Sequence, residues 1–234
     1  MRFSGIQKLT LLDFPDHTAC ILFTPGCNFR CGFCHNPEFV LPEKIREIAP
    51  SFIEEAPVLN FLRARQGFLE GVVISGGEPT IWPALPQFIR VVKQLGFLVK
   101  LDTNGNNPTM LESLLKEELL DYVALDVKMT LSGYAKLVGK GALEKNIQKS
   151  INLLKRGKVP YEFRTTLIRE IHTPTVLQEM RSLMRGAARL YLQTFRPEVT
   201  LHPKFRTYHP FSGEETQKLV DFFQAVIPEV SIRT

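Results

Sequence analysis

Residues 18–35 read Thr-Ala-Cys-Ile-Leu-Phe-Thr-Pro-Gly-Cys-Asn-Phe-Arg-Cys-Gly-Phe-Cys-His, and this stretch decides the fold. The run at residues 18–24 is apolar between two threonines, which is typical of a strand buried on both faces of a parallel sheet. A Pro-Gly pair ends that strand. Three cysteines follow on the loop: Cys27, Cys31 and Cys34. The sequence therefore predicts a buried strand that leads into a cysteine loop at residues 26–36.

The rest of the chain alternates between strand and helix patterns. Further strands are expected at residues 71–75, 97–101, 122–126, 161–166 and 189–195, with a short one at 230–232. Helices are expected at residues 51–65, 83–95, 109–117, 143–155, 173–184 and 212–225. Ser51 and Glu54 predict a capping box for the first helix, and three prolines make residues 37–50 look irregular. About six strand–helix units without a break in composition predict one α/β domain over residues 1–234, built on a parallel sheet.

The composition is that of an ordinary globular protein. Hydrophobic residues make up 44% of the 234 residues, and the net charge is +5 with the basic residues scattered. No apolar run is long enough to cross a membrane, and the first residues lack the apolar core of a signal peptide. We therefore expect a cytoplasmic protein whose four cysteines do not form a disulfide framework. No zinc-finger pair and no strand of interleaved aromatic and basic residues points to nucleic acid.

Polar residues and glycines collect where the predicted strands end. Besides the cysteine loop, they occur at residues 75–79 (Ser-Gly-Gly-Glu-Pro), 102–105 (Asp-Thr-Asn-Gly) and 126–128 (Asp-Val-Lys). Parallel barrels and open parallel sheets both place their active sites at the carboxyl ends of the strands. Each segment alone is an ordinary turn, but together they predict one site at this edge.

The cysteine loop is open to several interpretations. Four cysteines usually hold a cubane iron–sulfur cluster, so three thiolates from one loop would leave one iron open to a small molecule. Residues 31–35 also match the C-x-x-C-H pattern of covalent haem attachment, although such proteins are exported and Cys27 would have no role. A zinc site of three cysteines and His35 is chemically feasible, although His35 adjoins Cys34 instead of lying on a second knuckle. Cys20, within the strand, is interpreted as a small buried hydrophobe.

The cysteine spacing resembles the signature of the radical S-adenosylmethionine enzymes. Three residues separate Cys27 from Cys31, two separate Cys31 from Cys34, and the aromatic Phe33 precedes the last cysteine. The resemblance implies a [4Fe-4S] cluster on the three cysteines, with the open iron chelated by the amino and carboxylate groups of S-adenosylmethionine. One-electron reduction would cleave the sulfonium and release a 5′-deoxyadenosyl radical that abstracts hydrogen. The resemblance also implies a partial parallel (β/α)6 TIM-like barrel, in agreement with the strand–helix pattern.

The same resemblance assigns the other strand ends to S-adenosylmethionine. Gly76, Gly77 and Glu78 are similar to a Gly-Gly-Glu motif that holds the methionyl amine. In the glycyl-radical activating enzymes, segments similar to residues 102–105 and 126–128 line the cofactor. The implied cofactor-binding residues are Asp102, Thr103, Asn104, Asp126, Lys128 and Arg164, with Phe33 and His35 packing near the adenine. Hard oxygens of Asp102 and Asp126 would also suit a monovalent cation.

A few residues lie outside these motifs. Gln193 lies at the end of a late strand and is a further candidate for the adenine side. No motif surrounds three of the histidines, which are interpreted as surface or core residues: His172, His202 and His209.

Residues 5–16, Gly-Ile-Gln-Lys-Leu-Thr-Leu-Leu-Asp-Phe-Pro-Asp, resemble one branch of this superfamily, the anaerobic ribonucleoside-triphosphate reductase activating proteins. These relatives of the pyruvate formate-lyase activating enzymes take hydrogen from a glycine of a large partner and leave a stored glycyl radical. The resemblance implies a glycyl radical enzyme as protein substrate and a flavodoxin or ferredoxin as electron donor. The alternatives are a radical enzyme acting on a small molecule, such as a 7-carboxy-7-deazaguanine synthase, and a non-catalytic iron–sulfur or zinc protein.

Overall fold

The computed structural model describes residues 1–139, 141 and 143–233. The described chain divides into two compact units. Unit 1 comprises residues 1–28, 37–103 and 107–123, and unit 2 comprises residues 29–36, 104–106 and those from 124 onward. The single domain expected over residues 1–234 stays a prediction, and its residues 140, 142 and 234 lie outside the described part.

Most strands belong to one sheet. They are β2 (Gly5–Thr10), β3 (Ala19–Thr24), β5 (Gly71–Gly76), β6 (Leu98–Thr103), β7 (Tyr122–Asp126), β8 (Tyr161–Leu167), β9 (Arg189–Thr194) and β10 (Glu229–Arg233). They hydrogen bond in the order β10-β9-β8-β7-β6-β5-β3-β2. The pairs β3–β5, β5–β6, β8–β9 and β9–β10 are parallel, whereas β2 is antiparallel to β3. A two-stranded antiparallel sheet pairs β1 (Arg2–Phe3) with β4 (Ile53–Glu54).

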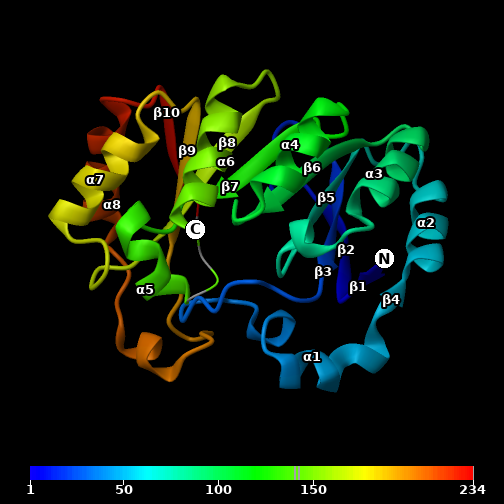
Figure 1. The fold of residues 1–234 in the computed structure, drawn as a ribbon, viewed down its shortest axis with the longest axis horizontal. Helices are drawn as coiled ribbons and strands as arrows, with labels where there is room; N and C mark the ends of the chain where they lie inside the picture. Colours follow the sequence, from blue (N-terminus) through cyan, green and yellow to red (C-terminus); the bar gives the residue numbers. More distant parts are fainter. Residues whose placement is uncertain (140, 142, 234) are drawn as a thin grey trace. The chain divides into compact units, whose positions relative to one another are not determined.

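Helices alternate with these strands along the chain, as Figure 1 shows from blue to red. They are α1 (Pro42–Ile48), α2 (Glu55–Arg63), α3 (Leu85–Gln94), α4 (Pro108–Lys116), α5 (Tyr134–Val138), α6 (Glu144–Arg156), α7 (Pro174–Met184) and α8 (Gly213–Gln224). Strand–helix units begin at β3, β5, β6, β7, β8 and β9, so the predicted alternation is confirmed. Among the described residues, no helix combines the length and apolar character that a membrane crossing needs.

In unit 1, the faces of the sheet are largely apolar because β3 and β5 carry unbroken hydrophobic runs. Ala19 and Ile21 of β3 pack with Val73 of β5, and Phe14 and Tyr122 join the same cluster. Helix α3 packs against β6 through a stripe with helical spacing. That stripe consists of Leu85, Phe88, Ile89 and Val92. The packing fixes where β3, β5 and β6 end.

At the starts of α7 and α8 in unit 2, side chains satisfy main-chain donors that have no partner within the helix. The hydroxyl of Thr173 accepts from the main-chain N–H of Val176 where α7 begins, and Pro174 is its first residue. At α8, Ser212 and Glu215 form a capping box. Helix α8 then packs against β10. The helix starts expected at residues 173 and 212 are confirmed.

Two local expectations are wrong. The helix predicted over residues 51–65 begins only at Glu55. The Ser51 hydroxyl donates to the carbonyl of Ile48 at 2.7 Å instead of capping that helix, so the predicted capping box does not form. Residues 37–50, expected to be irregular, contain α1, whose first residue is Pro42. Proline is well tolerated at that position because its missing N–H would have no helical partner.

Candidate functional site

The end of β5 lies against the start of the cysteine loop at two glycines. Gly76 has a φ of +110°, and a side chain there would meet the main chain of Thr24 at 2.4 Å. A side chain at Gly77 would meet the carbonyl oxygen of Gly26 at 1.9 Å. The N–H of Gly77 donates to the Thr24 carbonyl and the N–H of Glu78 to the Gly26 carbonyl, both at 2.8 Å. The glycine pair therefore fixes the main chain immediately before Cys27.

Glu78 is a buried hub within unit 1 and is only 1% exposed. Its Oε1 accepts from the main-chain N–H of Thr80 at 3.1 Å and from the Thr80 hydroxyl at 2.5 Å. The hydroxyl of Thr103, at the end of β6, donates to the same oxygen at 2.7 Å. Two of the predicted cofactor-binding residues, Glu78 and Thr103, are thus brought into direct contact.

Asp102 lies one residue earlier on β6 and is paired with a lysine. The ammonium of Lys100 is 2.7 Å from Asp102 Oδ1, and the Ser75 hydroxyl donates to Oδ2 at 3.1 Å. Lys100 is fully buried, and its ammonium also lies 5.8 Å from the ring centroid of Tyr122. Lysine is rarely buried without a partner. Lys100 was not anticipated, because a lysine in a strand usually faces water.

Asn104 follows in unit 2 and organises the next turn. Its Oδ1 accepts from the main-chain N–H of Asn106 at 2.9 Å, the side chain-to-backbone turn typical of asparagine. Asn106 then donates to the carbonyl of Gly141 at 2.7 Å and accepts from the N–H of Leu143 at 3.0 Å. These contacts give the Asn104 side chain a structural role, and its expected contact with a cofactor stays a prediction.

The cysteines differ in their surroundings. Cys27 and Cys34 are partly exposed and Cys31 is buried, while the N–H of Cys34 donates to the Cys31 carbonyl at 3.0 Å in a tight turn. Cys20 lies buried in β3, and burial raises the pKa of its thiol to about 12, in keeping with its interpretation as a hydrophobe.

Three thiols on one short loop suit an iron–sulfur cluster chemically, because thiolates are its usual ligands. Cys27 belongs to unit 1, whereas Cys31 and Cys34 belong to unit 2. Within the described residues of either unit alone, no three His, Cys, Asp or Glu side chains gather as metal ligands. The assignment of the three cysteines to one cluster stays a prediction.

In unit 2, the cysteine loop is supported by a later segment of the chain. The carbonyl of Gly32 accepts from the main-chain N–H of His202 at 2.9 Å. The ring of Phe33 lies 6.1 Å from that of Phe205 and 5.9 Å from the ammonium of Lys128. His202 therefore contacts the loop through its main chain, a role that no sequence motif indicated.

Asp126 is the centre of a charged cluster in unit 2. The ammonium of Lys128 lies 2.8 Å from Oδ2, and Nε of Arg164 lies 2.9 Å from Oδ1. Burial is the largest influence and lowers the pKa of Lys128, but the charges of Asp126 and Cys31 and the hydrogen bond to Asp126 together outweigh burial and raise that pKa. The hydroxyl of Tyr134 donates to the Asp126 carbonyl and accepts from the N–H of Lys128. The structure thus brings three predicted residues together: Asp126 at the end of β7, Lys128 just after it, and Arg164 on β8.

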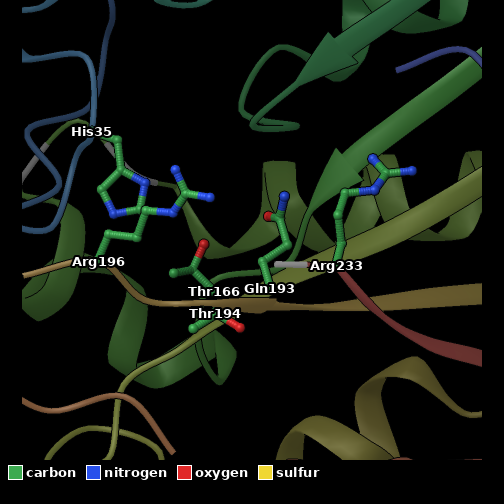
Figure 2. Close-up of a pocket in the computed structure, with 6 residues that line it drawn as sticks. All are labelled: His35, Thr166, Gln193, Thr194, Arg196 and Arg233. Carbon is green, nitrogen blue, oxygen red and sulfur yellow. The ribbon is translucent and has the colours of Figure 1, made fainter. Parts of the chain in front are cut away.

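Unit 2 also contains a polar cavity of about 180 Å³. Its lining residues are His35, Thr166, Gln193, Thr194, Arg196 and Arg233. Figure 2 shows His35 beside Arg196 and Gln193 beside Arg233. In the sheet register Thr166, Gln193 and Arg233 are aligned across β8, β9 and β10. The cavity therefore lies at the carboxyl ends of these strands, and it brings together two adenine-side candidates, His35 and Gln193.

The neighbours of His35 and Arg233 determine how these two side chains are held and charged at the cavity. Burial, together with the Arg196 charge, lowers the pKa of His35, whose ring stacks on Phe195 with centroids 6.1 Å apart. Arg233 lies over the ring of Tyr191 at 4.2 Å and pairs with the buried Glu162 at 3.5 Å. The sequence did not mark either arginine, because their place in the site depends on strand order.

Two further histidines of unit 2 have local partners. His172 is buried in unit 2, where its ring nitrogens contact main-chain groups of Ile168 and Lys128. His209 is exposed and pairs with Glu170 at 2.6 Å. Both match the expectation of core or surface residues.

Comparison with known proteins supplies the family. The family model described as "Radical SAM superfamily" matches residues 21–171, which is more than half of the chain. A protein of Methanocaldococcus jannaschii, provisionally named as a glycyl-radical enzyme activating enzyme, is 31% identical to this chain over 236 residues. The match spans 99% of this chain and 95% of that relative. The pyruvate formate-lyase-activating enzyme of Clostridium pasteurianum is 31% identical over 145 residues, 60% of this chain and 58% of that relative.

Solved structures share the fold. SuiB of Streptococcus suis bound to S-adenosylmethionine aligns with a TM-score of 0.66 at 15% identity, over 92% of this chain and 52% of that one. QueE from Escherichia coli aligns with a TM-score of 0.58 at 17% identity, over 100% of this chain and 93% of that one. The fold class predicted from the sequence is confirmed. The chain belongs to the radical S-adenosylmethionine superfamily of enzymes, and its relatives there include glycyl-radical enzyme activating enzymes.

Proposed function

We propose that the protein is an activase that takes a hydrogen atom from a glycine of a glycyl radical enzyme, and that this enzyme is an anaerobic ribonucleoside-triphosphate reductase. The observation that carries the activase assignment is the near full-length match to a relative with that name. The choice of reductase is supported by residues 5–16, which resemble the corresponding branch.

In this proposal Cys27, Cys31 and Cys34 hold a [4Fe-4S] cluster. The donor set fits, since three thiolates leave one coordination position for S-adenosylmethionine. When bound, the cluster and S-adenosylmethionine would supply the 5′-deoxyadenosyl radical that takes the hydrogen atom. The chain's own part is to hold both groups in place and to keep the loop rigid, and this part of the proposal is supported by the main-chain bonds from Glu78 to Gly26 and from His202 to Gly32.

Polar residues at the strand ends would bind S-adenosylmethionine. Gly76 and Gly77 lack side chains, which lets their main chain lie against Thr24 and Gly26 at the start of the cysteine loop, and Glu78 presents a fixed carboxylate. The Asp126 cluster has two cations for one carboxylate and therefore one net positive charge. That excess suits the ligand's carboxylate. Gln193 and His35, which line the cavity in unit 2, would contact the adenine.

A protein substrate requires a surface on which it can dock. Three leucines at the amino-terminal part of unit 1 are exposed: Leu9 (56%), Leu11 (68%) and Leu12 (78%). Exposed apolar groups of this kind mark interaction sites. We assign them to the glycyl radical enzyme, while a flavodoxin or ferredoxin would supply the electron elsewhere.

The test is to mix the anaerobically reconstituted protein with candidate glycyl radical enzymes, S-adenosylmethionine and a reductant. The expected result is a glycyl radical doublet in the electron paramagnetic resonance spectrum of the reductase. Cys31→Ala should abolish the doublet and S-adenosylmethionine cleavage, whereas the matched variant Cys20→Ala should retain both. Cleavage of S-adenosylmethionine without a radical on any candidate would contradict the activase proposal.

The polar cavity favours a second candidate function. Two guanidinium groups, Arg196 and Arg233, line it together with Gln193, a set that could hold a small anionic substrate. This is the small-molecule radical enzyme considered from the sequence, of the 7-carboxy-7-deazaguanine synthase kind. Under this alternative, S-adenosylmethionine cleavage would be stimulated by a small anionic molecule and not by a glycyl radical enzyme.

A further inference from the structure

Lys100 is a charged residue inside the core of unit 1. It lies on β6 two positions before Asp102, and residues with that spacing point to the same face of a strand. Lys100 is 0% exposed, and its ammonium is 2.7 Å from Asp102 Oδ1. Removing an ammonium from water is costly unless the charge is paired, so the burial of this lysine calls for a specific function.

The Asp102 carboxylate is engaged on both oxygens. Oδ1 accepts from Lys100, and Oδ2 accepts from the hydroxyl of Ser75 at 3.1 Å. The face of Tyr122 also lies 5.8 Å from the lysine ammonium, a favourable placement for a cation near an aromatic ring. Ser75 of β5 thus holds the carboxylate, and Tyr122 of β7 lies against the ammonium.

Asp126 in unit 2 is the other carboxylate expected to bind a monovalent cation, and both of its oxygens are also engaged by neighbouring side chains. Lys128 contacts its Oδ2 at 2.8 Å, and Arg164 contacts its Oδ1 at 2.9 Å. Each carboxylate is therefore matched by cationic side chains of its own unit. An alkali cation binds best where oxygen ligands carry negative charge that no other cation compensates. Neither Asp102 nor Asp126 offers such charge, because each is paired within its own unit.

We propose that Lys100 is the resident cation of the Asp102 carboxylate, so that the protein needs no bound sodium or potassium ion at this position. An ammonium is a compact charge with hydrogen-bond donors, and it gives the carboxylate the neutralisation that an alkali ion would give. A second cation near Asp102 would be repelled by the ammonium, and the low dielectric of a buried site strengthens that repulsion. Strand β6 thus carries its own counterion.

Thermal unfolding of the protein without cluster or S-adenosylmethionine tests this inference. The proposed function locates the cofactor near Asp102, but the measurement does not depend on cofactor or partner, so the two can fail separately. Melting temperatures are compared in potassium, sodium and choline chloride at equal ionic strength for the wild type and for Lys100→Met. The matched control is Lys93→Met, which removes another unit 1 ion pair, to Asp121 at 2.6 Å.

The wild type and Lys93→Met are expected to melt at the same temperature in all three salts. Lys100→Met leaves Asp102 without its ammonium, and potassium or sodium should raise its melting temperature over choline by roughly 2–4 °C or more. Sodium NMR gives an independent readout, because the sodium line should broaden with Lys100→Met and not with the wild type.

Two outcomes would overturn the proposal. The first is a wild type that is selectively stabilised by potassium or sodium, or that broadens the sodium line. The second is a folded Lys100→Met that responds to no cation. If Lys100→Met does not fold, the wild-type measurements decide alone, with the charge-free double variant Lys100→Met/Asp102→Asn as the control that should show no response to cations.

Discussion

Replacing Gly77 with alanine tests whether the glycine pair positions the cysteine loop. A β-carbon at Gly77 would lie 1.9 Å from the carbonyl oxygen of Gly26, whereas ordinary contact begins at 3.4 Å. The two segments must therefore separate by 3.4 − 1.9 = 1.5 Å. The new β-carbon would meet a main-chain oxygen, so no side chain can rotate away to relieve the overlap.

That separation removes two main-chain hydrogen bonds. A shift of this size lengthens the 2.8 Å bonds from Gly77 N–H to Thr24 and from Glu78 N–H to Gly26 beyond hydrogen-bond range. Each buried bond lost costs about 1–3 kcal/mol. For a chain of this size the total, roughly 2–6 kcal/mol, lowers the melting temperature by about 4–24 °C.

The assay is thermal unfolding of the cluster-free Gly77→Ala protein, followed by iron content after anaerobic reconstitution. Iron content should fall with stability, because the displaced carbonyl belongs to the residue directly before Cys27. Gly213→Ala is the matched control, since a β-carbon there meets nothing within 4 Å. A Gly77→Ala protein that melts with the wild type and binds as much iron would refute the reasoning.

Three further predictions concern other parts of the molecule. Arg164→Ala should weaken S-adenosylmethionine binding at unchanged iron content, because Asp126 loses one of its two cations; calorimetric titration would show equal affinity if the assignment is wrong. Burial raises the pKa of the Cys20 thiol from its ordinary 9.0 to about 12 in the folded protein, so above pH 9.0 the unfolded chain loses a proton that the native protein keeps. Native stability should therefore fall by about 1.4 kcal/mol per pH unit in that range relative to Cys20→Ala, and parallel urea curves for the two proteins would contradict it. The double variant Leu11→Ser/Leu12→Ser should lower the yield of glycyl radical and leave S-adenosylmethionine cleavage unchanged, and an unchanged yield would exclude this docking surface.

Long periodic segments of the fold could be predicted from the sequence. Strands such as β3 and β5 carry unbroken apolar runs, and α8 carries its own capping box at Ser212 and Glu215. The prediction of where α2 starts was wrong for a local reason. Ser51 has the right spacing to Glu54, but its hydroxyl bonds to Ile48 in the preceding turn. The N-cap is therefore Glu54, three residues later, and the sequence pattern does not show that the main chain turns before the helix begins.

The grouping of polar residues at the strand ends was predictable, as at Glu78, Asp102 and Asp126, while their role in cofactor binding stays a prediction. It was not predictable where its members come from a strand interior or from the last strand. Lys100 looks like a surface lysine in the sequence, and only the pairing with Asp102 explains its burial. Arg233 lines the cavity because β10 pairs with β9 and places it opposite Gln193. Which strands pair in the sheet cannot be seen in the pattern of one strand.

The carboxylate of Glu78 has a further consequence for binding. Three hydrogen bonds converge on its Oε1, from the N–H and hydroxyl of Thr80 and the hydroxyl of Thr103. A free glutamate side chain loses roughly 1.5–2 kcal/mol of rotamer entropy when it is fixed in one orientation. Here that ordering happens during folding, so a ligand reaching this strand end meets a preorganised acceptor. Thr103→Val, which keeps the shape and removes one restraint, would transfer part of that entropy cost to the binding step.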